Sequence, residues 1–382
     1  MKVGLSTSVI QRGKTGIAQY VFALTRALAA HGGPHEFTLF VLEEDIPLFN
    51  FLTGKIQIVS VPERFRPAVK NILWHQTQLP RLARQLQLDV LHVPSYRRLL
   101  WRKPCALVAT IHDLAPFHVT GKYDWKRMFY GRVVVRRLAR RQDRVIAISQ
   151  NTARDIHSFF RLPEERITVI HNGLEHDRFF PGSLTQARSA AGQKYGLRQP
   201  FFLYVARLEH PAKNHVRLIT AFNQFKTATR SSWQLVFGGS DWHGAEAIHA
   251  ALKSSPFASD IRSLGFVDNA DLPNLYRAAD VFVYPSLFEG FGLPPVEAMA
   301  CGCPVISSGC GSLAEVVGNA AAMVDPESIS SIASVLTTLA CEPATRDTFR
   351  TLGLAQARQF NWAKTAAATL AVYESAAAQA QP

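Results

Sequence analysis

Residues 281–300, which read VFVYPSLFEGFGLPPVEAMA, carry the most informative pattern in this sequence. Its apolar start predicts a buried strand at residues 281–284. Gly290 and Gly292 follow in a loop, and residues without a Cβ let a backbone approach a ligand closely. A helix is expected from Pro294, because the first helical amides lack intrahelical partners and proline is tolerated there. These amides and the positive end of the helix dipole would form a seat for phosphate oxygens.

The same order of strand, loop and helix recurs along the chain. In the first half, short apolar runs predict strands at residues 3–9, 37–42, 89–93, 106–112 and 144–149. In the second half, strands are expected at residues 201–205, 233–237, 261–264, 281–284 and 304–307. Helical spacing between the strands, as at residues 16–31 and 124–141, indicates repeated βα units. Such units build a parallel sheet with helices on both faces.

The length of the chain favours two domains, because 382 residues exceed what one hydrophobic core usually supports. The best candidate boundary is the segment at residues 181–200, which is rich in glycine, proline and serine. The expected fold class is α/β, with two doubly wound domains of residues 1–182 and 183–360. In such folds, ligands bind in the crevice at the carboxyl ends of the strands.

The net charge of +13 is unevenly distributed. Residues 1–185 carry 27 Lys and Arg against 14 Asp and Glu, and the rest of the chain is balanced. Residues 124–144 form a basic amphipathic pattern, and residues 96–103 mix aromatic, aliphatic and basic side chains. Both segments suit an anionic membrane surface, although a solvated basic face stays an alternative. Nucleic acid is not expected as a partner, because no recognisable binding motif accompanies the charge.

The sequence also indicates a compartment. No run of about 18 apolar residues predicts a membrane-spanning helix. The first residues are expected to form a strand rather than a secretory signal. The five cysteines form no CxxC pair, so neither a metal site nor disulfides are expected and a reducing cytoplasm is the default.

Two carboxylates flank the glycine loop. Glu289 can accept hydrogen bonds from neighbouring sugar hydroxyls, and Glu297, in the first helical turn, can bind a ribose diol. Taken singly, each could also be an ordinary solvent-exposed charge. Their separation by seven residues resembles the E-x7-E motif of retaining glycosyltransferases, and the flanking sequence resembles glycosyltransferase family 4.

Other segments resemble the same family. They are residues 202–214 (FLYVARLEHPAKN), similar to its phosphate-binding segment, and residues 170–173 (IHNG), 264–267 (LGFV), 300–306 (ACGCPVI) and 360–362 (FNW). The last of these precedes, in the family, a helix that crosses back to the first domain, here residues 361–382. The resemblance implies the GT-B fold, in which two Rossmann-like domains enclose a deep cleft.

The resemblance also implies where the donor binds. Its matches are Gly16, His112, Arg207, Lys213, Phe266, Val267, Glu289, Gly290, Phe291, Gly292, Leu293 and Glu297. In the family, Gly16 lies in a loop facing the donor phosphates and the acceptor. His112 lies near the donor sugar and diphosphate, and Asp113 could hold its ring in position.

Arg207 and Lys213 have a further physical rationale. A departing nucleoside diphosphate gains negative charge as the glycosidic bond breaks, and cations stabilise it. An arginine grips phosphate oxygens with its planar fork, and a lysine acts as a point charge. The sequence contains no Asp-x-Asp, the usual metal–diphosphate clamp of the other large glycosyltransferase fold. We therefore expect protein cations, rather than a metal ion or any cofactor, to carry this charge.

The predicted function is transfer of a sugar, with retention, from a nucleotide-sugar to a lipid-linked glycan acceptor in bacterial surface polysaccharide synthesis. The segment from Glu209 to His215 is most similar to enzymes that use GDP-mannose. A UDP-sugar donor, a nucleotide-sugar 2-epimerase on the same scaffold, or a non-catalytic basic module are the alternatives. The expected location is cytoplasmic, peripheral at the inner face of the cytoplasmic membrane.

Overall fold

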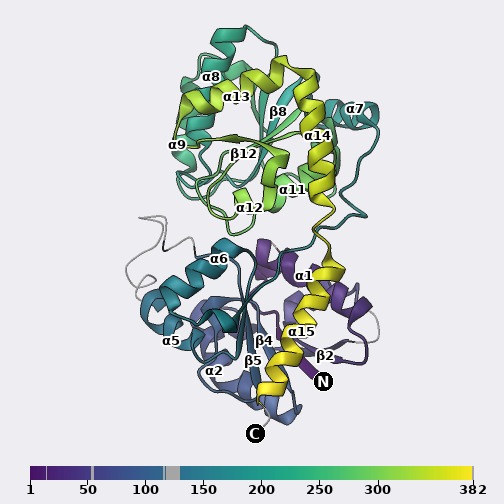
Figure 1. Ribbon diagram of the computed structural model, residues 1–382, viewed down its shortest axis with the longest axis vertical. Helices are drawn as coiled ribbons and strands as arrows, with labels where there is room; N and C mark the ends of the chain where they lie inside the picture. The colour runs from purple at the N-terminus through teal and green to yellow at the C-terminus, as the bar shows by residue number, and fades with distance from the viewer. Residues whose placement is uncertain (14, 53–55, 115–116, 118–129, 381–382) are drawn as a thin grey trace. The chain divides into compact units, whose positions relative to one another are not determined.

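The computed structural model describes residues 1–13, 15–52, 56–114, 117 and 130–380 (Figure 1). The chain divides into two compact units. Unit 1 comprises Met1–Gly173 and Asn361–Pro382, and unit 2 comprises Leu174–Phe360. The first boundary therefore precedes the one expected after residue 182. The reason is packing: Phe179 is buried, with its ring centroid 6.1 Å from that of Tyr276 in unit 2.

Unit 1 is built on a parallel sheet of seven strands in the order β3-β2-β1-β4-β5-β6-β7. Its strands are β1 Lys2–Ser6, β2 Glu36–Leu42, β3 Ile56–Val61, β4 Val90–Val93, β5 Ala106–Ile111, β6 Arg144–Ala147 and β7 Ile167–Val169. The first strand ends before the expected residue 9, because Thr7 turns the chain. Its hydroxyl donates to the Phe40 carbonyl at 3.0 Å, and its own carbonyl accepts from the Ile10 amide at 3.1 Å.

Helices cover both faces of this sheet. They are α1 Gly16–His31, α2 Ala68–Gln85, α5 Arg136–Ala139, α6 Gln150–Asp155 and α15 Trp362–Ala380. Successive side chains of a strand point to opposite faces. In β2, Leu39 therefore joins the core under α1 and α15, while Phe40 packs with Trp74 of α2. The C-terminal helix α15 thus belongs to the hydrophobic core of unit 1.

The helix expected at residues 124–141 falls partly outside the described residues, which omit 118–129. Beyond that gap, the structure has a π-helical segment, Tyr130–Val135, followed by α5.

Unit 2 contains a six-stranded parallel sheet in the order β10-β9-β8-β11-β12-β13. Its strands are β8 Phe201–Val205, β9 Gln234–Gly238, β10 Ile261–Ser263, β11 Val281–Tyr284, β12 Val305–Ser308 and β13 Ala321–Val324. Its helices are α7 Leu184–Tyr195, α8 His215–Thr229, α9 Ala245–Ser254, α10 Leu272–Ala278, α11 Leu293–Ala300, α12 Leu313–Val317, α13 Ile329–Cys341 and α14 Pro343–Ala357.

Both sheets have the doubly wound Rossmann order, so the expected fold class is confirmed for each unit. The strand order reverses between β1 and β4 in unit 1, and between β8 and β11 in unit 2. Ligands of open α/β sheets bind at the carboxyl ends of strands beside such a reversal. Among the described residues, no helix is long and apolar enough to cross a membrane.

Candidate active site

The loops after β8 and β11 bring two of the predicted residues together. The Lys213 Nζ lies 2.5 Å from Glu289 Oε1, and both side chains are largely shielded from solvent. The Ser286 hydroxyl donates to the same carboxylate oxygen at 2.6 Å. These residues flank the point where the strand order reverses. Glu289 is therefore a fixed, paired carboxylate rather than a solvated loop residue.

Hydrogen bonds to main-chain carbonyls hold the Lys213 loop against the loops after β11 and β13. Asn214, in the left-handed conformation at φ 62°, donates from Nδ2 to the carbonyls of Pro285 at 3.0 Å and Pro326 at 2.7 Å. The Leu287 amide donates to the Ala212 carbonyl at 2.9 Å. The position of the ammonium group is thus set by the main chain as well as by its ion pair.

The glycine loop leads into α11 as the sequence predicted, although the helix begins at Leu293, one residue before Pro294. Gly292 precedes the helix at φ 99°, a conformation that favours glycine. The Ser312 hydroxyl donates to the carbonyls of Glu289 at 3.0 Å and Phe291 at 2.9 Å. The loop is therefore held by hydrogen bonds to its carbonyls. Because Pro294 and Pro295 have no N–H, the amides of the glycine loop and of Leu293 remain the predicted phosphate seat.

Glu297 is partly buried in α11. Its Oε2 accepts a hydrogen bond from the Tyr276 hydroxyl at 2.9 Å. Burial raises the pKa of Glu297 to about 7, and the Tyr276 bond and the nearby charge of Arg178 act in the opposite direction. A carboxylate that titrates near neutrality beside the glycine loop has the chemistry of the predicted ribose ligand.

The loop after β10 carries two more of the predicted donor-binding residues, Phe266 and Val267. The side chain of Phe266 is 76% exposed, whereas Val267 is buried beside Gly238. The Gly239 amide donates to the Gly265 carbonyl at 2.7 Å and so ties this loop to the end of β9. An exposed aromatic ring offers a stacking face, which suits a nucleobase.

Gly16 and His112 lie in unit 1, whereas the other predicted site residues lie in unit 2. Gly16 is the first residue of α1, and the Thr15 hydroxyl caps that helix by accepting from the Ala18 amide at 3.2 Å. A Cβ added at Gly16 would meet no described atom within 4 Å. The start of α1 is therefore open enough for a ligand to approach.

His112 follows β5 and is neutral. Burial lowers its pKa to about 4, opposed by a hydrogen bond to the Pro94 carbonyl. Its Nε2 is buried and has no hydrogen-bond partner among the described residues, so Nδ1 makes the Pro94 bond. With the proton on Nδ1, Nε2 is an acceptor that a substrate hydroxyl could satisfy.

A buried polar chain supports the His112 region, and the sequence did not predict it. The Tyr20 ring lies edge-on to His112 with centroids 4.7 Å apart, and its hydroxyl lies 3.2 Å from Thr110 Oγ1. His92 lies between Thr110 Oγ1, at 2.8 Å, and the Tyr373 hydroxyl of α15, at 2.7 Å. The C-terminal helix is thus connected to the residue that packs against His112.

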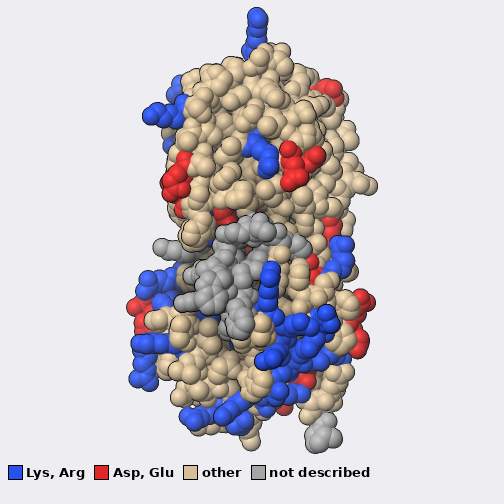
Figure 2. Space-filling view, turned by 90° about the vertical axis from the view of Figure 1, so that its left-hand side faces the viewer, with Lys and Arg blue, Asp and Glu red and all other residues tan. Residues whose placement is uncertain are grey.

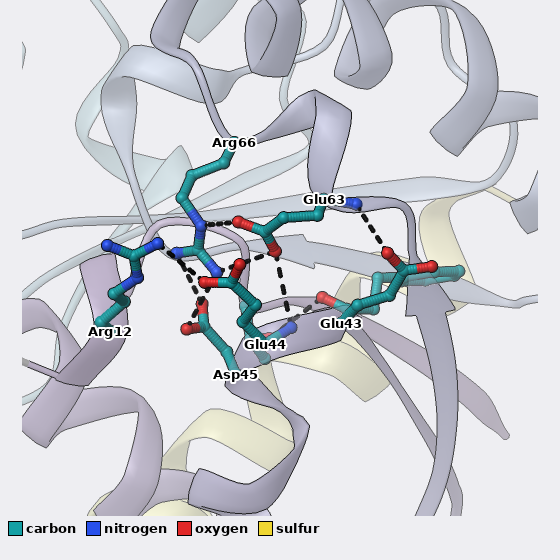
Figure 3. A network of polar contacts seen from close by, with 8 residues as sticks. Arg12, Glu43, Glu44, Asp45, Glu63 and Arg66 are labelled. Atoms are coloured by element: carbon teal, nitrogen blue, oxygen red, sulfur yellow. Dashed lines mark hydrogen bonds and ion pairs between the residues drawn. The ribbon is translucent and has the colours of Figure 1, made fainter.

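A second network ties together the loops after β1, β2 and β3 (Figure 3). Its labelled members are Arg12, Glu43, Glu44, Asp45, Glu63 and Arg66. Arg12 pairs with Glu44 at 2.7 Å, and Arg66 binds both Glu63 and the buried Asp45. The Arg66 guanidinium lowers the pKa of Glu63. The network anchors the chain just before Gly16.

Two Rossmann-like units, each built on a doubly wound parallel sheet, define a two-domain α/β protein of the GT-B type. Comparison with known families identifies it further. Residues 188–353 match the family described as Glycosyl transferases group 1, and residues 14–178 match Glycosyltransferase Family 4. The chain belongs to these glycosyltransferases.

Individual relatives agree with this assignment. The chain is 29% identical to O-antigen chain mannosyltransferase B of Escherichia coli, over 98% of this chain and 100% of the relative. It is 31% identical to the serotype-specific mannosyltransferase WbdA of Escherichia coli, over 69% of this chain and 32% of that protein. Sucrose-phosphate synthase from Thermosynechococcus elongatus shares the fold, with a TM-score of 0.80, 21% identity, and coverage of 99% and 100%.

Proposed function

We propose that this glycosyltransferase transfers a mannosyl residue from GDP-mannose to a lipid-linked glycan acceptor, with retention of anomeric configuration and without a metal ion. The 2.5 Å contact between Lys213 and Glu289 carries the proposal, because a cation that can balance phosphate charge and a carboxylate that can accept hydroxyl hydrogen bonds lie side by side at the strand reversal. The choice of mannose is supported by the names of the two Escherichia coli relatives.

In the proposed reaction, some residues balance the charge of the leaving group and others orient the donor. Lys213 and Arg207 would balance the charge that develops on the departing diphosphate, and the start of α11 would bind its oxygens through backbone amides. Glu289 would orient the sugar by accepting hydrogen bonds from its hydroxyl groups. Glu297 would hold the ribose. The neutral His112 would accept a hydrogen bond from the donor sugar through Nε2.

The acceptor side is proposed to dock on an anionic membrane surface at the inner face of the cytoplasmic membrane. The most exposed large apolar side chains of unit 1, among the described residues, are Val69 and Leu73 on α2, at 79% and 58%, and Trp101, at 52%. Arg141 stacks on Trp101 with Cζ 4.8 Å from the ring centroid. Figure 2 shows many Lys and Arg side chains on the face of unit 1 that it draws. Apolar anchors among cations fit an interface of anionic lipids.

The function is tested with purified protein, GDP-mannose, UDP-sugars and a lipid-linked saccharide acceptor. The expected result is an acceptor-dependent product that retains the donor's anomeric configuration, with GDP as the second product. Conversion of the donor sugar without any acceptor would instead identify a 2-epimerase. A UDP-sugar as the preferred donor would correct the assignment of GDP-mannose while preserving the transfer reaction.

A further inference from the structure

Two extended segments leave the unit 2 sheet side by side after β8 and β9. Their backbones are joined by hydrogen bonds from the Ala206 amide to Gly238, the Leu208 amide to Ser240, the Trp242 amide to Leu208 and the His210 amide to His243, at 2.9–3.0 Å. The strand pairing therefore continues beyond the sheet, and it fixes the positions of the residues on both segments.

A side chain from the first segment, Arg207, contacts a side chain from the second, Trp242. The Arg207 guanidinium lies over the Trp242 ring, with Cζ 4.7 Å from the ring centroid. Both are half-exposed: the Arg207 side chain at 54% and Trp242 at 48%. An arginine over an indole face is held by cation–π attraction and by planar stacking.

The geometry of the loop depends on glycine at two positions. A Cβ on Gly239 would lie 1.9 Å from the Ala206 carbonyl oxygen. Gly244 has φ 76°, and a Cβ there would lie 2.8 Å from the His210 carbonyl oxygen. The two segments approach closely only because both side chains are absent, and this approach brings Trp242 under Arg207.

Stacking has a specific consequence for an arginine that binds phosphate. The indole occupies one face of the guanidinium, whereas its N–H groups point outward in the plane of the group. The stack therefore restricts the rotamers of an exposed side chain and leaves the edges of the guanidinium uncovered. One edge nitrogen, Nη2, lies 3.9 Å from Glu209 Oε2, and the remaining N–H donors can face a ligand. Restricting a flexible side chain before binding lowers the entropy lost when the ligand arrives.

We propose that Trp242 is a positioning residue that holds Arg207 toward the diphosphate of the donor. This inference rests on the proposed function, which assigns Arg207 to the diphosphate. Because the stack positions a side chain that would contact the diphosphate, it should raise the affinity for GDP and UDP equally. It should raise the affinity for GMP and UMP less.

The test is calorimetric binding of GDP, UDP, GMP and UMP to the full chain. Trp242→Ala should weaken GDP and UDP binding about three- to fivefold, and Trp242→Phe should restore part of the loss. Lys253→Ala, which changes an exposed side chain at the far end of α9, should bind like the wild type. In the Arg207→Ala background, Trp242→Ala should cause no further loss.

Four outcomes would overturn the assignment. The first two are that Trp242→Ala binds GDP and UDP as tightly as the wild type, and that it loses as much affinity for the monophosphates as for the diphosphates. The third is that Trp242→Ala causes the same loss of affinity in the Arg207→Ala background. The fourth is that Arg207→Ala binds GDP and UDP like the wild type. Failure of the wild-type chain to bind GDP or UDP would overturn the proposed function itself, and this result is distinct from the other four.

Discussion

The Tyr276 hydroxyl of α10 donates a hydrogen bond to Glu297 of α11 at 2.9 Å, and the tyrosine ring is buried. This pair places an acid with a pKa of about 7 beside the proposed ribose position. A phenol that donates to a carboxylate favours the charged form, whereas burial favours the protonated form. The ionisation of Glu297 should therefore control donor binding near neutral pH.

We expect GDP affinity to rise as the pH rises through about 7, because only the Glu297 carboxylate accepts two ribose hydroxyls. The raised pKa has the opposite effect on stability. Glu297 binds its proton more tightly in the folded protein than in the unfolded chain. The stabilisation that this difference gives is present in full below about pH 4.5 and is lost as the pH rises through about 7. Calorimetric GDP titrations from pH 5.5 to 8.5 measure the first effect. Glu297→Gln should bind weakly at every pH, and a persistent pH dependence in that variant would contradict the assignment.

Tyr276→Phe should shift the midpoint of this pH profile upward, because it removes the hydrogen bond that lowers the Glu297 pKa. The ring is retained, so the packing of α10 changes little. The same GDP titrations provide the measurement, and Tyr195→Phe is the matched control, since its hydroxyl bonds Asp271 instead. An unshifted midpoint in Tyr276→Phe would show that the phenol does not act on Glu297.

Local sequence patterns predicted much of the fold. The apolar run at residues 281–284 is β11, and the two Rossmann sheets follow from the repeated βα pattern. The predicted start of α11 differs by one residue, because Gly292 at φ 99° lets Leu293 begin the helix. The boundary after residue 173 was missed, because the burial of Phe179 against Tyr276 depends on a partner far along the chain.

Site residues that belong to a motif with a fixed spacing could be predicted from the sequence. Contacts between side chains that are distant in sequence could not. The E-x7-E spacing pointed to Glu289 and Glu297, and the structure adds their contacts with Lys213 and Tyr276. The stack of Arg207 on Trp242 leaves no periodic trace in the sequence. The same is true of the bond between His92 and Tyr373, residues that are distant in sequence. Such contacts arise from strand order and crossover, which local propensity does not encode.

Lys213→Ala and Glu289→Ala should each lower turnover by at least about 100-fold, the loss typical when a preorganised group that stabilises developing charge is removed. Lys213→Ala also leaves a shielded carboxylate without its cation, which should cost about 1–2 kcal/mol of stability. Steady-state kinetics and thermal unfolding measure the two effects. Lys253→Ala, an exposed lysine of α9, is the control. Near-normal activity in both site variants would remove the assignment.

EDTA should leave turnover unchanged, because the proposed charge stabilisation comes from Lys213, Arg207 and backbone amides. Rates are measured with and without EDTA after dialysis, and again after addition of Mg²⁺ or Mn²⁺. A loss of activity that Mn²⁺ restores would contradict the metal-independent mechanism.

Leu73→Glu and Trp101→Glu should weaken binding to vesicles rich in anionic lipid, because each places a negative charge where an apolar anchor is proposed. Co-sedimentation at low salt provides the measurement, and wild-type binding should weaken as salt screens the cations. Leu352→Glu, at an exposed leucine of α14 in unit 2, is the matched control. Equal binding by all four proteins, or none by the wild type, would contradict the proposed membrane surface.

His112 should not contribute to the pH profile near neutrality, because burial lowers its pKa to about 4 and the ring stays neutral above pH 5. His112→Ala should therefore reduce kcat strongly while leaving the shape of the profile between pH 6 and 8 unchanged. His112→Gln supplies an amide oxygen that can accept a hydrogen bond from a hydroxyl group, so this variant should recover part of the rate. If the step near pH 7 vanished in His112→Ala and persisted in Glu297→Gln, the roles of the two residues would have to be exchanged.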